Sequence, residues 1–144
     1  MLFISLCMFA ILPLQASAEE NAITEINYSA LPGDQVQIRM SLENLASEPG
    51  SFTIDSPARI AFDFPNTKVK LAERSQSIGI GVARNIKTVE AGGRTRVVLN
   101  LSRLVTYNTV VDGNDVIVTL GGSSSTSKTN KVAGLPSATT DKNI

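Results

Sequence analysis

The side chains with the clearest chemical potential in this sequence are basic, and they lie in its second half. Nine basic residues fall between Arg59 and Arg103 against three acidic ones, whereas the stretch from Glu19 to Asp55 holds seven acidic residues and one basic residue. Such a local excess can attract an anionic partner although the whole chain carries 13 basic and 13 acidic residues. For any single residue, a solvated position on the outer side of a strand is the simpler interpretation.

The composition excludes several kinds of catalytic site. The chain has no His, which removes an imidazole base, a Ser–His or Cys–His pair and a His-bearing zinc site. Its balanced charge and a sequence pI near 6.2 argue against a nucleic-acid-binding protein, because such proteins normally carry a basic excess. The composition therefore favours a binding or structural protein over an enzyme, with no cofactor and no metal expected.

Two short motifs resemble parts of known ligand sites but lack the remainder. Gly79-Ile80-Gly81 has the spacing of two glycines in a dinucleotide-binding loop, yet no third glycine follows in a strand-to-helix context. Asp112-Gly113-Asn114-Asp115 offers oxygen ligands, but the closing Glu of a twelve-residue calcium loop is missing. A hairpin turn explains the second motif fully.

The elements that must position the basic side chains are β-strands. Hydrophobic and polar residues alternate across residues 19–121, and no stretch follows the 3.6-residue period of a long helix. Alternation is clearest in 35–42, 59–64 and 95–101. The residues predicted to face the core in these strands are Val36, Ile38, Met40, Leu42, Ile60, Phe62, Phe64, Val97, Leu99 and Leu101.

Shorter strands complete an all-β domain. Turn-forming residues separate them, and Pro32-Gly33-Asp34, Gly92-Gly93 and Asp112-Gly113-Asn114 each fit a tight turn or hairpin. Seven or eight short, mostly antiparallel strands at this spacing predict a single β-sandwich over residues 19–121. The shorter strands are expected at 22–28, 51–55, 78–90 (bent, or broken near Gly81), 105–111 and 115–120.

The stretch from Asn66 to Gln76 is the longest without clear alternation. We expect a loop there, or one short helical turn around Leu71-Ala72-Glu73. Loops of this length in compact domains often carry binding contacts.

Both ends of the chain differ in composition from the part between them. Residues 1–18 are mostly apolar, carry no charge and end in Ala16-Ser17-Ala18, the small-x-small pattern that signal peptidase cleaves, so we predict a secretory signal. Cys7 lies inside this segment, and cleavage would leave a chain without Cys and without disulfides. Residues 122–144 are rich in Ser, Thr and Lys and predict a flexible linker, truncated here, to further domains.

Three of the predicted strands carry the motifs of a known family. Pro57-Ala58-Arg59-Ile60-Ala61-Phe62-Asp63-Phe64-Pro65-Asn66 resembles the Pro-x-Arg-hydrophobic-x-hydrophobic-Asp-hydrophobic-Pro strand of the AMIN domain. Val82-Ala83-Arg84-Asn85-Ile86-Lys87 and Thr95-Arg96-Val97-Val98-Leu99-Asn100-Leu101 are similar to its next two signature strands. The family usually has an acidic residue where Asn100 stands. The resemblance covers residues 22–121.

The resemblance implies a non-catalytic periplasmic β-sandwich that binds peptidoglycan. AMIN domains occur at the N-terminus of N-acetylmuramoyl-L-alanine amidases and of type IV pilus secretins. The order of signal peptide, opening strand, domain and linker is most similar to a secretin, which implies a homo-oligomeric ring in the outer membrane, held at the cell wall. An amidase parent is the alternative. This chain could then be only the targeting part, because the zinc centre of those enzymes uses His ligands and the chain has no His.

The family strands and the basic stretch together select candidate peptidoglycan contacts. Arginine pairs with carboxylates through two hydrogen bonds, and the stem peptides of peptidoglycan carry carboxylates. The predicted contact residues are Arg59, Arg84, Lys87, Arg94 and Arg96.

Simpler roles stand beside this prediction. Arg59 and Asp63 share one face of a strand and could instead engage neighbouring strands. Arg94 and Arg96 flank a hairpin, where a solvated tip would explain them. Tyr28 and Tyr107 could pack against sugar rings, although Tyr107 fits better as a half-buried strand aromatic.

A protein-docking module is the competing hypothesis. An open sandwich edge could pair with a strand from a pilus assembly lipoprotein, an inner-membrane pilus protein or a second AMIN copy. Docking of this kind would show little salt sensitivity, whereas binding through arginines weakens as salt rises.

Overall fold

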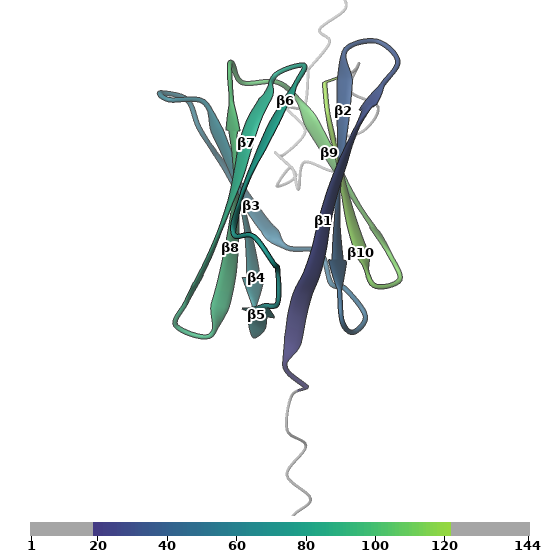
Figure 1. The fold of residues 1–144 in the computed structure, drawn as a ribbon, viewed down its shortest axis with the longest axis vertical. Helices are drawn as coiled ribbons and strands as arrows, with labels where there is room; N and C mark the ends of the chain where they lie inside the picture. The colour runs from purple at the N-terminus through teal and green to yellow at the C-terminus, as the bar shows by residue number, and fades with distance from the viewer. Residues whose placement is uncertain (1–18, 122–144) are drawn as a thin grey trace, which may run out of the picture.

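The computed structural model describes residues 19–121, which form two five-stranded sheets packed face to face (Figure 1). Neighbouring strands run antiparallel, except for one parallel pair, β1 and β5. The all-β sandwich is therefore confirmed, with ten strands in place of the seven or eight predicted. Sheet A contains, in spatial order, β5 (Thr67–Val69), β1 (Asn21–Leu31), β2 (Gln35–Leu42), β10 (Asp115–Leu120) and β9 (Tyr107–Asp112). Sheet B contains β3 (Gly50–Ile54), β4 (Arg59–Pro65), β8 (Arg94–Leu101), β7 (Ala83–Ala91) and β6 (Ser75–Ile80).

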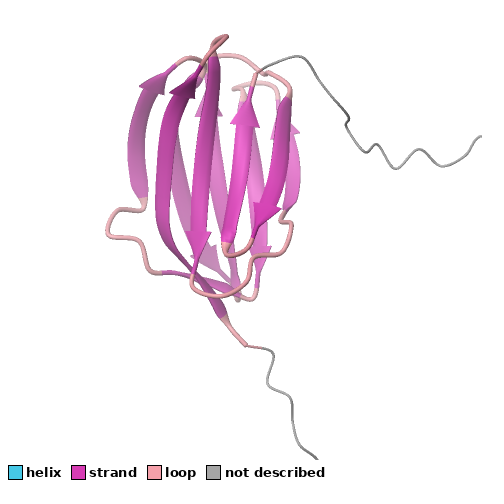
Figure 2. Ribbon diagram, turned by 90° about the vertical axis from the view of Figure 1, so that its right-hand side faces the viewer, coloured by secondary structure: helices cyan, strands magenta, loops and turns pink. Residues whose placement is uncertain are grey.

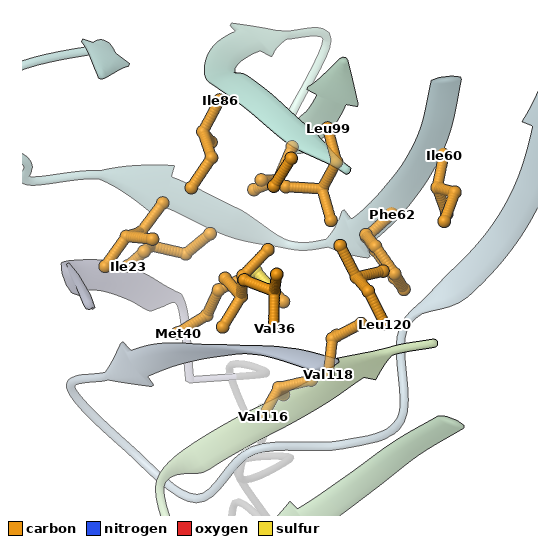
Figure 3. Packing of buried hydrophobic residues seen from close by; sticks show 14 of the residues in the cluster. Ile23, Val36, Met40, Ile60, Phe62, Ile86, Leu99, Val116, Val118 and Leu120 are labelled. Atoms are coloured by element: carbon orange, nitrogen blue, oxygen red, sulfur yellow. The ribbon is translucent and has the colours of Figure 1, made fainter. Parts of the chain in front are cut away.

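Alternate side chains from both sheets fill the space between them (Figure 3). All ten residues predicted to face the core from β2, β4 and β8 are buried, and none is more than 7% exposed. Full burial of one such side chain stabilises a fold by about 1.5–3 kcal/mol, so this layer holds the domain together. Because side chains alternate along a strand, the buried set also fixes which residues point outward from each sheet.

The segment from Asn66 to Gln76, predicted as a loop or a helical turn, contains β5, a loop over residues 70–74 without a helical turn, and the start of β6. The chain leaves sheet B at Pro65 and joins sheet A beside the first residues of β1. Asn66 makes this crossing with a φ of 47°, and its carbonyl accepts a hydrogen bond from the Asn21 N–H at 3.0 Å. The loop prediction is confirmed for residues 70–74 and wrong for β5, which has only three residues, too few to show alternation.

The predicted turns lie between neighbouring strands. Gly92 and Gly93 join β7 to β8 with φ values of 60° and 73°, as a type I′ hairpin requires. The break expected near Gly81 is also present, since Gly81 and Val82 separate β6 from β7. Other strand ends differ from the prediction by at most three residues, as at the end of β1, which continues to Leu31, and at the start of β6, which begins at Ser75.

Two tyrosines connect the sheets along opposite sides of the sandwich. The Tyr28 hydroxyl on β1 donates a hydrogen bond to the Ser77 carbonyl on β6 at 3.0 Å. The Tyr107 hydroxyl on β9 and the Ser51 hydroxyl on β3 share a hydrogen bond of 2.8 Å. The Tyr107 ring also meets Phe62 edge to face, with centroids 5.8 Å apart. The prediction that Tyr107 is a half-buried strand aromatic is confirmed, and both hydroxyls bond within the domain.

The first and last residues of the described segment lie at opposite ends of the sandwich (Figure 2). Leu120, the last residue of β10, is level with Val36 on β2 and hence with Ala30 near the far end of β1. The predicted signal segment with Cys7 (1–18) and the predicted linker (122–144) lie outside the described residues.

Candidate functional site

The outward side chains of sheet B form a surface that is predominantly basic, which we call the basic face. All five predicted contact residues lie on it, and the one carboxylate among its outward positions is that of Asp63. The structure therefore brings together residues spread over 38 positions of sequence, because three adjacent strands carry them. These are Arg59 on β4, Arg84 and Lys87 on β7, and Arg94 and Arg96 on β8.

The strand register sorts the basic face into cross-strand rows. In one row Asp63 of β4 lies opposite Arg96 of β8. Four residues away along the same two strands, Arg59 lies opposite Asn100, which in turn lies opposite Asn85 of β7. Directly opposed side chains have Cβ atoms about 5 Å apart, so each row is a set of neighbours that can interact.

Arg96 is held by groups of the domain itself. Its Nε and one terminal nitrogen donate hydrogen bonds to the two Asp63 oxygens at 2.6 and 2.8 Å. The guanidinium carbon also lies 5.0 Å from the centre of the Phe52 ring, a cation–π contact. The hydrogen bond from Arg96 lowers the pKa of Asp63 below its usual range. The positive charge of Arg96 is thus largely matched within the domain, and the expectation that Asp63 engages a neighbouring strand is confirmed.

Arg59 has a different environment from Arg96. Across the strand it meets an amide, Asn100, rather than a carboxylate. Its Nε is buried without a hydrogen-bond partner, and no ion pair with it forms among residues 19–121. The amide nitrogen of Asn100 donates to the side-chain oxygen of Asn85 at 2.6 Å. Arg59 therefore keeps an uncompensated charge next to a pair of amides.

The other three cations of the basic face are exposed and form no ion pair with the described residues. Arg84 occupies a bulge in β7, where the register with β8 shifts between Ala83 and Asn85. A bulge places one extra residue opposite its partner strand and can redirect a side chain. Arg84 thus lies beside the Asn85–Asn100 pair, and β8 separates its strand from that of Arg59.

Three members of this surface were not predicted as contacts. Asn85, Asn100 and Phe52 all point outward from sheet B. For the two asparagines a signal was available, since counting outward from a two-residue turn at Gly92-Gly93 pairs Asn85 with Asn100. For Phe52 no signal was available, because the sequence alone does not show that the Arg96 guanidinium lies over its ring.

The outward face of sheet A has a different composition. Its one cation on β1, β2, β9 and β10, Arg39, pairs with Asp115 at 2.7 Å. The pKa of Asp115 is lowered first by a hydrogen bond from Ser41 and then by Arg39. Amides and hydroxyls occupy much of the rest, with Asn27, Gln37 and Thr119 on adjacent strands.

Other features of the described residues are weaker candidates for a functional site. An open hollow of about 330 Å³ lies where β10 ends, and its lining includes Asp34, Arg103 and Gly121. Within residues 19–121 no three His, Cys, Asp or Glu side chains gather as metal ligands would. The same residues contain no helix of the length and apolar character that a membrane crossing needs.

Comparison with known proteins places this domain in a family. The sequence profile described as "AMIN domain" matches residues 25–120. The chain belongs to the AMIN domain family. The match covers both sheets and every strand of the basic face.

Curated relatives are similar to most of this chain. The fimbrial assembly protein PilQ of Pseudomonas aeruginosa is 37% identical over 116 residues, 81% of this chain and 16% of the relative. The type IV pilus biogenesis and competence protein PilQ of Neisseria gonorrhoeae is 33% identical over 110 residues, 76% of this chain and 15% of the relative. The chain thus spans about a sixth of the length of these relatives. No solved structure gives a significant match.

Proposed function

We propose that this AMIN domain is a non-catalytic module that binds peptidoglycan through its basic face. The carrying observation is that four of the five cations on that face have no ion-pair partner among residues 19–121. The stem peptides of peptidoglycan offer carboxylates, and the glycan offers hydroxyls and amides. Guanidinium groups match the first kind of group, and Asn side chains match the second.

The surface fits weak, repeated contacts better than a deep sugar pocket. Both tyrosine hydroxyls bond within the domain, so aromatic stacking on sugars is not what the basic face provides. Polar contacts on an open sheet are individually weak, because water competes for them. Several copies in one assembly would raise the effective affinity without any new contact.

The full protein that we propose is a type IV pilus secretin. The similarity to the PilQ proteins of Pseudomonas aeruginosa and Neisseria gonorrhoeae supports this parent, and the predicted export signal supports a periplasmic location at the cell wall and outer membrane. In such a protein the domain would anchor a homo-oligomeric ring of secretin subunits. An amidase parent, in which the same domain would act as a targeting part, is the alternative.

Co-sedimentation with insoluble peptidoglycan sacculi tests the proposal. The core residues of the described part of the chain lie within 22–120, so a chain of residues 19–144, without the predicted signal, contains all of them. It should pellet with sacculi at about 50 mM NaCl and much less at about 500 mM, because salt screens exposed charges.

A matched pair of triple variants locates the binding surface. Changing Arg59, Arg84 and Lys87 to Gln should abolish pelleting. Changing Arg39, Lys68 and Lys70 to Gln removes the same charge away from the basic face and should leave pelleting intact. Equal losses in both variants would contradict a localised site. A folded chain that stays in the supernatant at every salt concentration would overturn the proposal and favour docking to a pilus assembly partner.

A further inference from the structure

Two arginines on the basic face occupy equivalent positions and differ in one neighbour. Arg96 and Arg59 belong to the same β4–β8 ladder, and each lies directly opposite a residue of the other strand. Asp63 opposite Arg96 accepts two hydrogen bonds from it. Asn100 opposite Arg59 is an amide, and no carboxylate reaches Arg59 among the described residues. Comparison with the Arg96–Asp63 pair therefore shows that the group missing opposite Arg59 is a carboxylate.

A carboxylate bound next to Arg59 would have further hydrogen-bond donors around it. Arg84 flanks the Asn85–Asn100 pair from the β7 bulge, and Lys87 lies in the next row. Because the Asn100 nitrogen already donates to the Asn85 oxygen, the Asn85 nitrogen retains both of its donor hydrogens. The Arg59 Nε is buried, so this side chain presents its terminal guanidinium nitrogens to an incoming group. An incoming carboxylate would meet guanidinium and amide donors, with no acidic residue of the face beside it.

We propose that the row Arg59–Asn100–Asn85, with Arg84, is a carboxylate-binding subsite for the free carboxylates of peptidoglycan stem peptides. This subsite rests on the proposed function and makes it more specific, since the ligand group is the peptide carboxylate rather than the sugar. Asn100 is the specificity-determining residue, because an Asp there would neutralise Arg59 as Asp63 neutralises Arg96.

The test uses one small probe and its uncharged partner. Acetyl-D-alanyl-D-alanine carries one carboxylate, and its C-terminal amide carries none. Titrated into residues 19–144, the acid should shift the side-chain amide NMR signals of Asn85 and Asn100, and the amide should not. Asn27 on the opposite face serves as an internal reference signal.

Two isosteric substitutions separate the subsite from net charge. Asn100→Asp should weaken binding of the acid by about tenfold or more, the range of a charge-assisted hydrogen bond. Asn27→Asp makes the same chemical change on the outward face of sheet A, opposite Arg39, and should change binding less than about twofold. Arg59→Gln should weaken binding as Asn100→Asp does, which covers the case in which the Asp variant fails to fold.

The outcomes separate this inference from the proposed function. If the chain pellets with sacculi but the acid and the amide probes give the same NMR shifts, the subsite is refuted and peptidoglycan binding still stands. Selective binding of the acid by a chain that does not pellet with sacculi would support a carboxylate subsite but refute peptidoglycan as its ligand, and with it the proposed function. Equal weakening by Asn100→Asp and Asn27→Asp would show a general charge effect and overturn the subsite.

Discussion

The outward faces of the two sheets share a geometry and differ in how their charges are matched. Each face has a cross-strand ion pair, Arg39 with Asp115 on sheet A and Arg96 with Asp63 on sheet B. On β1, β2, β9 and β10 of sheet A the pair uses the one outward cation, whereas the outward face of sheet B carries four more cations than carboxylates. A long-range field toward anions therefore comes from one side of the molecule.

The comparison shows that residue types alone do not define the charged surface. Arg96 and Arg59 have identical side chains on neighbouring strands, yet one faces a carboxylate and the other an amide. What differs is the residue directly across the ladder. A single cross-strand position thus decides whether a guanidinium stabilises the sheet or stays available to a ligand.

The largest effect should be a loss of stability on substitution in the hydrophobic core, which lies between the two outward faces. Phe62 is fully buried between the sheets and packs against Tyr107. Phe62→Ala should lower the free energy of unfolding by about 3–5 kcal/mol, because it removes burial and leaves a cavity. Urea unfolding measures this loss.

Val89→Ala is the matched control for Phe62→Ala, since Val89 lies on the basic face and is 54% exposed. Its effect should be within about 0.5 kcal/mol. A similar loss in both variants would mean that the shared core does not dominate stability.

The sequence was sufficient for the features that depend on local pattern. Alternation identified all ten core residues in β2, β4 and β8, and a hairpin at Gly92-Gly93 determined the β7–β8 register. The crossing at Asn66 was not predictable, because β5 pairs with β1, which lies more than 40 positions earlier in the chain. The five candidate cations do share one face, but the pairing of Arg96 with Asp63 depended on placing β4 beside β8.

A smaller effect concerns the links between the two sheets. Tyr107→Phe removes a hydroxyl that bonds to the Ser51 side chain, and Tyr28→Phe removes one that bonds to a backbone carbonyl. Each should cost about 0.5–1 kcal/mol in urea unfolding, the lower part of the range for one hydrogen bond. The two losses should add in the double variant, because the links lie on opposite sides of the sandwich. A loss in the double variant well beyond the sum would show that the sides are coupled.

Releasing Arg96 should sharpen the difference between the faces. Asp63→Asn removes the carboxylate that matches Arg96 and adds one uncompensated cation to the basic face. Affinity for sacculi should rise by about two- to threefold at low salt, an effect of the size expected for an exposed charge. Asp115→Asn frees Arg39 on the other face and should leave sacculus binding unchanged. A rise in both variants would point to net charge rather than to the basic face.

The smallest effect is the acid dependence of the two ion-paired carboxylates. The hydrogen bond from Arg96 lowers the pKa of Asp63, and hydrogen bonds from Ser41 and then Arg39 lower the pKa of Asp115. A lowered folded-state pKa gives stability that is present above the unfolded value of about 3.9 and is lost as pH falls through the folded value. Each Asn variant should therefore be less stable than the parent near pH 7, with the difference shrinking as the pH falls below about 3.9. Urea midpoints across this range measure both curves. Added salt should shrink both differences, because each carboxylate is paired with an arginine across the strands. A difference that does not shrink as the pH falls would contradict the stabilising role of the ionised carboxylates.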